Sequence, residues 1–152
     1  MREIKFRGKR INDKEWVEGF VSVHTICGEK TYLATVINVK PQKIYDVESH
    51  EVDPATVGQY TGLKDKNGVK IYEGDIVSGT ALSRNRTGVI VWIDELAGFG
   101  VRYAERNDPT AWQESSILKN IATHNYSNFC AVVIGNIHDN PDLLEGGKAD
   151  AD

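Results

Sequence analysis

Residues 62–77 read GLKDKNGVKIYEGDIV, and this stretch carries the clearest local signal in the chain. Asn67-Gly68 supplies the positive φ that a tight hairpin turn requires, and apolar residues flank it on both sides. Tyr72–Asp75 predicts a second turn, which leads into the apolar pair at 76–77. Two turns with short apolar segments between them indicate antiparallel strands rather than a helix.

The same β signal extends over most of the chain. The 15 Val and 13 Ile outnumber the 7 Leu, and β-branched residues favour strands. Alternating apolar and polar residues at 3–7 and 16–23, separated by a turn at 10–15, predict an N-terminal hairpin over residues 3–23. Further strands are expected at 31–39, 88–93, 98–103 and 130–137, and short helical turns at 53–54 and 140–144. Segment 112–122 fits a returning strand or a helix begun by Asp108-Pro109, and we favour the strand.

We therefore expect a mainly-β fold, a small barrel or sandwich with an SH3-like barrel portion and few short helical turns. An N-terminal β-hairpin region over residues 1–60 is expected to pack on the barrel. Residues 61–145 are expected to form the SH3-like β-barrel region, and residues 146–152 a flexible acidic tail. The apolar alternation predicts one shared core, made of Val77, Val89, Val91, Phe99, Val101, Val133 and Ile137, with the 88–103 segment buried on both faces.

Composition is that of a globular protein. Of the 152 residues, 40% are hydrophobic and 26% are charged, which argues against a disordered chain. The longest apolar run, 129–134, is far shorter than the roughly 20 residues of a membrane helix. Because the N-terminus has no apolar stretch of a secretory signal, we expect a cytoplasmic protein that does not enter membranes and has Cys27 and Cys130 as free thiols.

Three blocks of sequence span the chain from end to end. They are MREIKFR at 1–7, QYTGLKDKNG with IYEGDIV at 59–77, and VIGNIHDNPDLL at 133–144. In content, order and spacing these blocks resemble the YopX family of phage and prophage proteins. The resemblance implies a small, mainly-β protein that is encoded by a phage or an integrated element and works in a bacterial cytoplasm. It implies no activity or cofactor, and residues 24–57 and 104–130 depart from the family's pattern.

The sequence contains no recognisable pattern of catalytic or metal-binding residues. Its four histidines are scattered, and it has no phosphate-binding glycine loop and no nucleophile motif. His24 and Cys27 lie three residues apart, but residues at that spacing on a strand point to opposite faces. We therefore expect no enzyme activity, no catalytic residue, no cofactor and no metal ion.

Basic and aromatic residues near the hairpins form a candidate interaction surface, which comprises Lys5, Arg7, Trp16, Tyr60, Lys64, Lys66 and Tyr72. One hypothesis is an accessory protein that associates with other proteins, as a homo-oligomer or with a host or phage partner. The alternative is a small β-barrel that binds nucleic acid, in which aromatic rings stack on bases and lysines follow phosphates. A formal net charge of −4 disfavours a polyanionic partner, so we favour protein association. Packing in the core or at its rim also accounts for both tyrosines.

Overall fold

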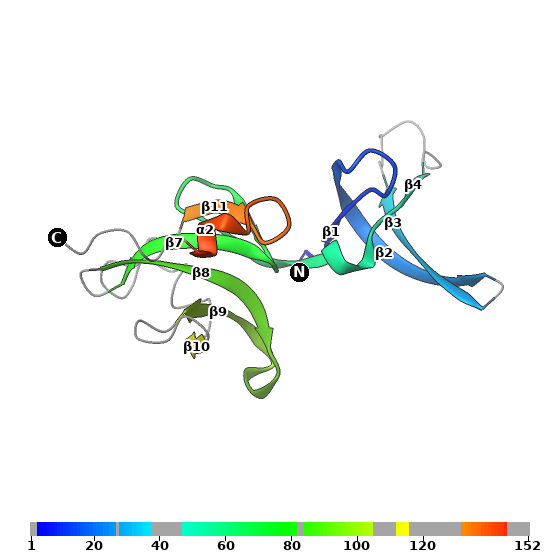
Figure 1. Ribbon diagram of the computed structural model, residues 1–152. Coiled ribbons are helices and arrows are strands. Elements are labelled where there is room, and N and C mark those ends of the chain that lie inside the picture. The colour runs from blue at the N-terminus through cyan, green and yellow to red at the C-terminus, as the bar shows by residue number, and fades with distance from the viewer. Residues whose placement is uncertain are drawn as a thin grey trace. The chain divides into compact units, whose positions relative to one another are not determined.

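The computed structural model describes residues 3–26, 28–37, 47–81, 84–104, 112–115 and 132–145. The chain divides into two compact units, Met1–Tyr60 and Thr61–Asp152. Among the described residues, strands account for nearly all regular structure, and the helical elements are two 3₁₀ turns and one short α-helix (Figure 1). The predicted mainly-β fold with few helical turns is therefore confirmed.

The first unit is built from antiparallel strands in the order β4-β3-β2-β1-β5. Its elements are β1 (Phe6–Lys9), β2 (Trp16–Ile26), β3 (Glu29–Ile37), β4 (Val47–Glu51), the 3₁₀ turn η1 (Pro54–Thr56) and the start of β5 (Gly58–Lys64). The predicted N-terminal hairpin is confirmed, because β1 pairs with β2 in a register that places Lys9 opposite Trp16. The helical turn expected after Asp53 is also present: the Asp53 carboxylate accepts a hydrogen bond from the Ala55 N–H at 3.0 Å.

Strand β1 is paired along both of its edges. β2 lies on one side, and the start of β1 pairs with β5 on the other. Just beyond the end of β1, Arg10 forms a β-bridge with Val52, and the Asp53 N–H donates to the Lys9 carbonyl at 2.9 Å. Because Val52 follows β4 directly, the two ends of the first unit's sheet meet beside β1.

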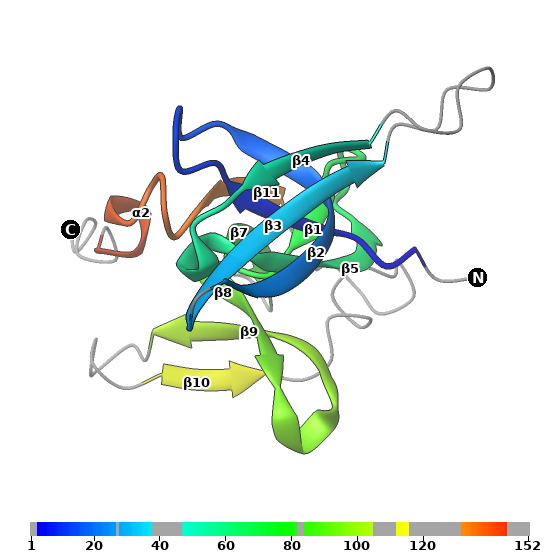
Figure 2. The same cartoon turned by 90° about the vertical axis from the view of Figure 1, so that its right-hand side faces the viewer.

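The second unit begins within β5 and contains a sheet with strand order β10-β9-β8-β7-β11. Its elements are β6 (Lys70–Tyr72), β7 (Asp75–Ala81), β8 (Arg84–Ile93), the 3₁₀ turn η2 (Asp94–Leu96), β9 (Gly98–Ala104), β10 (Trp112–Ser115), β11 (Val132–Asn136) and α2 (Asp142–Glu145). Gly68 has a φ of +84°, as expected for the turn between β5 and β6. β9 and β10 lie side by side in Figure 2. Segment 112–122 therefore begins as a strand, which is the alternative that we favoured over a helix.

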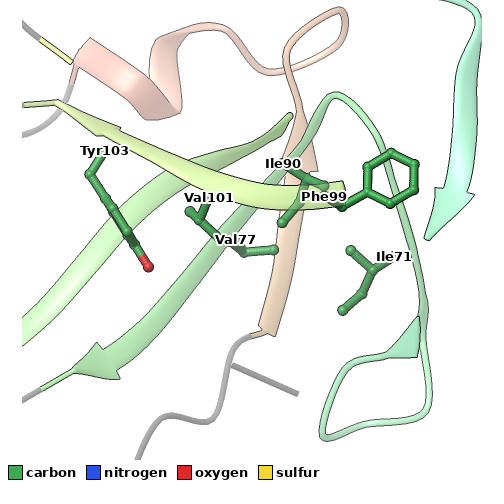
Figure 3. Packing of buried hydrophobic residues seen from close by; sticks show 6 residues of the cluster. All are labelled: Ile71, Val77, Ile90, Phe99, Val101 and Tyr103. Atoms are coloured by element: carbon green, nitrogen blue, oxygen red, sulfur yellow. The ribbon is translucent and has the colours of Figure 1, made fainter. Parts of the chain in front are cut away.

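The main core of the second unit lies on one face of β7, β8 and β9. Its buried members are Ile71, Val77, Ile90, Phe99, Val101 and Tyr103, with Leu63 and Val133 packed against them. In Figure 3, Val77, Ile90 and Val101 lie together in the middle of the cluster, with Tyr103 at one end. Ile71 and Phe99 lie at the other end, so the cluster runs along the strands.

Four of the seven predicted core residues lie in or against this cluster, namely Val77, Phe99, Val101 and Val133. The assignment of Val89 and Val91 to it is wrong. Ile90 is the direct partner of Val101 and shares its face, so the residues before and after Ile90 point to the opposite face. The sequence pattern alone did not distinguish these two faces because apolar residues occupy both.

The opposite face of β7 and β8 is also buried. Ile76, Val89 and Ile93 are all buried there. The expected burial of 88–103 on both faces therefore holds for part of β8, but it is wrong for Trp92 and Leu96, which are 41% and 47% exposed. Ile137 is 37% exposed, so its assignment to the core is wrong. β11 ends at Asn136, one residue earlier than predicted, and Ile137 lies in the turn that follows.

The SH3-like barrel portion and the packing of region 1–60 on it stay predictions. β10 and β11 are the outermost strands of the second unit's sheet, and residues 116–131 between them lie outside the described residues. The predicted acidic tail at 146–152, Cys27, Cys130 and the whole of segment 38–46, with the end of the strand expected at 31–39, also lie outside them. No helix of the described residues is long and apolar enough to cross a membrane.

Candidate functional site

The Asp65 carboxylate joins two of the sequence blocks quoted above. Its Oδ1 accepts hydrogen bonds from the N–H groups of Asn67 and Val69, both at 2.8 Å. Its Oδ2 accepts a hydrogen bond from the Val133 N–H in β11 at 3.1 Å. Asp65 therefore fixes the hairpin turn and ties that turn to a strand 68 residues away.

The turn between β6 and β7 has a similar structural role. The Tyr72 N–H donates to Asp75 Oδ2 at 2.7 Å, and Asp75 is buried. Gly74 bonds to two other segments: its N–H donates to the Ile90 carbonyl at 2.9 Å, and its carbonyl accepts from the Ile137 N–H at 3.0 Å. The Tyr-Glu-Gly-Asp sequence thus anchors β8 and the end of β11.

The turn after β11 is organised by two asparagines. Asn136 Oδ1 accepts hydrogen bonds from the N–H groups of His138 and Asp139, both at 3.0 Å, and its Nδ2 donates to Asp139 Oδ2 at 2.8 Å. Asn140 Oδ1 packs directly against Gly135: if Gly135 carried a Cβ atom, that atom would lie 2.5 Å from Asn140 Oδ1. The residues of these two blocks therefore build turns and strand pairing.

The most distinctive surface among the described residues is one face of the β1–β2 hairpin. Side chains two residues apart on a strand share a face, and directly paired residues share it across the strands. Arg7 pairs with Glu18 and Lys9 with Trp16, which places them together. We name this the β1–β2 face, and its members are Glu3, Lys5, Arg7, Lys9, Trp16, Glu18 and Phe20.

Charges on the β1–β2 face are close to one another. The Lys5 Nζ lies 2.9 Å from the Glu3 carboxylate and 3.5 Å from the Glu18 carboxylate. The Arg7 guanidinium carbon lies 4.7 Å from the centroid of the Trp16 ring, and the Lys9 Nζ lies 5.7 Å from it, which are cation–π distances. With three cations and two carboxylates, the face has a net formal charge of about +1.

Phe20 adds an apolar group to the same face. Its ring is 53% exposed, although β2 pairs with strands on both sides. Trp16 is half-buried beneath the two cations. Aromatic rings that share one face with an arginine are the side-chain types enriched in the centres of protein–protein interfaces.

The candidate surface predicted from the sequence divides between the two units. Lys5, Arg7, Trp16 and Tyr60 belong to the first unit, and Lys64, Lys66 and Tyr72 to the second. Lys64 and Lys66 are both exposed. Tyr60 and Tyr72 are only 5% and 3% exposed, so they pack as buried residues and are not available for stacking on bases.

Tyr60 also reports on the electrostatics of the first unit. Burial raises the pKa of its hydroxyl above the ordinary value of 10.0, and the negative charges of Glu3 and Glu18 raise it further, while Lys5 opposes the shift. Its N–H donates to the Lys5 carbonyl at 2.8 Å. Tyr60 thus lies beside the acidic residues of the β1–β2 face.

Four members of the β1–β2 face are absent from the predicted surface, namely Glu3, Lys9, Glu18 and Phe20. The signal that identifies them is the pairing register, because Trp16, Glu18 and Phe20 alternate along β2. A hairpin with a known turn fixes which of these residues lie opposite Arg7 and Lys9.

The part of the chain that the structure describes holds no group of three or more His, Cys, Asp or Glu side chains placed to bind a metal ion. Ser22 Oγ and His24 Nε2 lie 3.0 Å apart on the exposed surface of β2. A serine and a histidine at this distance do not by themselves make a site for acyl transfer, which also needs an orienting acid and oxyanion donors. The pairing of His24 with Cys27 lies outside the described residues.

Comparison with known proteins identifies the family. A family model described as YopX protein matches residues 5–145, which is nearly the whole chain. The crystal structure of protein EF1440 from Enterococcus faecalis is similar, with 27% sequence identity and a TM-score of 0.53, and the match covers 95% of this chain and 99% of that one. No curated protein matches the chain. With its β fold and the three sequence blocks, this chain belongs to the YopX protein family.

Proposed function

We propose that this chain is a phage- or prophage-encoded accessory protein that acts by associating with other proteins, including copies of itself, in the cytoplasm of a bacterial host. We propose no catalytic role and no cofactor for it. The observation that carries the proposal is the β1–β2 face, where an exposed Phe20 ring lies on the same side of the hairpin as a Trp16 ring stacked with Arg7. Aromatic and arginine side chains of this kind dominate the energetics of protein interfaces.

The charges of this face favour a protein partner over a nucleic acid. A nucleic acid binds where protein cations neutralise its phosphates and release the counterions condensed on them, but the Lys5 ammonium already lies beside two carboxylates. The Trp16 ring, which could stack on a base, is already in contact with Arg7 and Lys9. A protein surface of mixed charge can satisfy cations, carboxylates and aromatic rings together.

Sedimentation velocity of the full chain at micromolar concentration tests the proposal. We expect a dimer or larger assembly that persists at physiological salt. Phe20→Ser removes the exposed ring and should shift the assembly toward monomer. The matched control Leu96→Ser, which removes a 47% exposed side chain from η2 in the second unit, should leave the assembly intact.

Binding of a fluorescent single-stranded oligonucleotide, measured by anisotropy, tests the alternative function. A nucleic-acid-binding protein would lose affinity by about 0.7 log units per log unit of salt for each phosphate neutralised. A chain that stays monomeric and holds the oligonucleotide at physiological salt would overturn protein association in favour of nucleic-acid binding.

A further inference from the structure

The turn between β5 and β6 exposes an asparagine that is followed by a glycine. Asn67 and Gly68 are both exposed, and Asn67 is the one asparagine in the sequence that precedes a glycine. Gly68 has a φ of +84°, and apart from its two chain neighbours no heavy atom lies within 4 Å of the position that a Cβ would occupy. The peptide bond between the two residues therefore has open space beside it, and an asparagine side chain can react with the backbone there.

This reaction is deamidation, and it joins the Asn67 side chain to the Gly68 backbone. Once the Gly68 N–H has lost its proton to the solvent, the nitrogen attacks Asn67 Cγ: a bond from this nitrogen to Cγ forms, the Cγ–Nδ2 bond breaks, and ammonia leaves. Water then opens the resulting succinimide ring at one of its two carbonyl carbons. Opening at Cγ gives aspartate, and opening at the main-chain carbonyl carbon gives isoaspartate, in which the backbone runs through the former side chain. A glycine after the asparagine favours the attack because it has no Cβ to obstruct ring closure.

The folded turn restrains this reaction through the backbone and the side chain of Asp65. The Gly68 N–H donates to the Asp65 carbonyl at 3.0 Å, so the nitrogen that must attack keeps its proton and is oriented toward Asp65. Asp65 Oδ1 accepts the N–H groups of Asn67 and Val69 at 2.8 Å and keeps the turn closed. Because the nitrogen becomes available only when the turn opens, the rate in the folded chain is the rate of the open turn multiplied by its population.

The isoaspartate product cannot keep the same hydrogen bonds. It places one additional carbon in the main chain between residues 67 and 68, so the N–H groups on either side of it can no longer all meet their acceptors on Asp65. The reaction also adds a carboxylate at residue 67, whose backbone nitrogen lies 2.8 Å from Asp65 Oδ1, and like charges this close repel each other. Since Asp65 Oδ2 accepts the Val133 N–H at 3.1 Å, displacement of the Asp65 side chain frees β11 from the turn.

We infer that Asn67 is a site of spontaneous deamidation whose rate is controlled by the hydrogen bonds of Asp65, and that conversion to isoaspartate releases the β5–β6 turn from β11. The reaction needs only water and consumes no cofactor. The inference concerns the second unit alone and does not depend on the partner proposed above.

Site-resolved mass spectrometry of the full chain, incubated in mildly alkaline buffer at physiological temperature, tests the site and its control. The mass change from NH₂ to OH should accumulate at residue 67 before it does at Asn12, which is also exposed in a turn but precedes Asp13. In urea, residue 67 should convert about tenfold faster or more, because the turn is then fully open. This comparison uses the unaltered chain, so it needs no variant that must fold.

Variants of Asp65 and Asn67 assign the effect to the turn. Asp65→Ala should bring the rate in native buffer toward the rate in urea, whereas Asp94→Asn, which alters an exposed carboxylate elsewhere in the second unit, should leave it unchanged. Asn67→Gln keeps an amide but disfavours ring closure, because the ring would need one more atom, and should show no mass change at residue 67. Circular dichroism of each variant checks the fold.

Ion-exchange chromatography separates the deamidated chain by its additional negative charge, and fragmentation by electron transfer distinguishes isoaspartate from aspartate. Amide hydrogen exchange at Val133 should be faster in the isoaspartate form than in the unreacted chain. Asn67→Asp adds the same charge on a normal backbone and should accelerate this exchange less.

Each part of the inference has an outcome that would overturn it. Conversion at residue 67 that is no faster than at Asn12 would overturn the site. Equal rates at residue 67 in native buffer and in urea would overturn the control by the folded turn. Unchanged exchange at Val133 in the isoaspartate form would overturn the release of β11.

Discussion

Replacing Asp65 with Asn tests whether one carboxylate holds the β5–β6 turn against β11. Asp65 is 8% exposed and accepts three backbone hydrogen bonds, two through Oδ1 inside the turn and one through Oδ2 from Val133. Asparagine has the same shape and keeps one acceptor oxygen, so the two bonds inside the turn can persist. Its NH₂ group then faces the Val133 N–H, and two donors cannot bond to each other.

The magnitude follows from the bond that is lost. A hydrogen bond to a charged group contributes about 1.5–3 kcal/mol, and a buried N–H left without an acceptor carries a similar penalty. We expect Asp65→Asn to lower the free energy of unfolding of the second unit by about 2 kcal/mol. Asp65→Ala removes all three bonds. Its cost should be about 3 kcal/mol and not three times that of one bond, because water can reach the exposed turn and replace part of the lost hydrogen bonding.

Urea denaturation combined with residue-resolved amide hydrogen exchange measures both effects. In Asp65→Asn, exchange at Val133 should accelerate while Asn67 and Val69 keep the protection that they have in wild type. Asp94→Asn is the matched control, because Asp94 accepts a hydrogen bond from the Trp92 indole at 2.9 Å in an exposed site. Asparagine keeps an acceptor oxygen there, so the change should cost less than about 0.5 kcal/mol. Unchanged exchange at Val133 in Asp65→Asn would refute the proposed tie between the turn and β11.

Three further predictions concern folding. Gly68→Val should destabilise the protein by about 1 kcal/mol or more, measured as a lower denaturation midpoint, because a β-branched residue is strained at a φ of +84° even though the space around it is open. Gly88→Ala should lower the free energy of unfolding by more, about 2–3 kcal/mol, because the new Cβ would lie 2.8 Å from the Arg102 carbonyl oxygen and backbone cannot move aside cheaply. A stability equal to wild type would contradict this packing. Above pH 10 the unfolded chain loses the Tyr60 proton before the folded chain does, because folding raises the pKa of Tyr60, so stability should fall as the pH rises from 10 toward the folded pKa. Tyr60→Phe should remove that part of the alkaline loss in pH-dependent urea titrations, and an identical pH profile for both proteins would argue against it.

Turns were the most predictable part of this fold. The positive φ at Gly68 and the cap at Asp53 follow from chemistry within a few residues, and both appear where the sequence places them. The face of a buried strand is harder to predict. In β8, Val89, Ile90 and Val91 are all apolar, and only the pairing of Ile90 with Val101 shows which one enters the main cluster. That pairing is a tertiary fact, and a shift of one residue reverses every assignment.

The candidate surface was predictable to the same limited degree. Composition singled out Lys5, Arg7 and Trp16, and the structure brings them together on one face. Composition could not separate them from Tyr60, because a tyrosine has an apolar ring suited to a core and a hydroxyl suited to a surface. Phe20 was missed for the opposite reason: an apolar residue in a strand is expected to be buried, and here it is exposed.

Two of the three sequence blocks that identify the family, at 59–77 and 133–144, contribute no member of the β1–β2 face, whereas the first block, at 1–7, supplies three of its seven members. Asp65, Gly74 and Asn136 hold turns and strands of the second unit together through hydrogen bonds with the backbone. Most of the β1–β2 face needs only alternating side chains on a hairpin, and many residue types satisfy that requirement. These two later blocks therefore specify how the chain folds, whereas the proposed binding of a partner depends on exposed positions such as Glu18 and Phe20, whose identity the fold does not dictate.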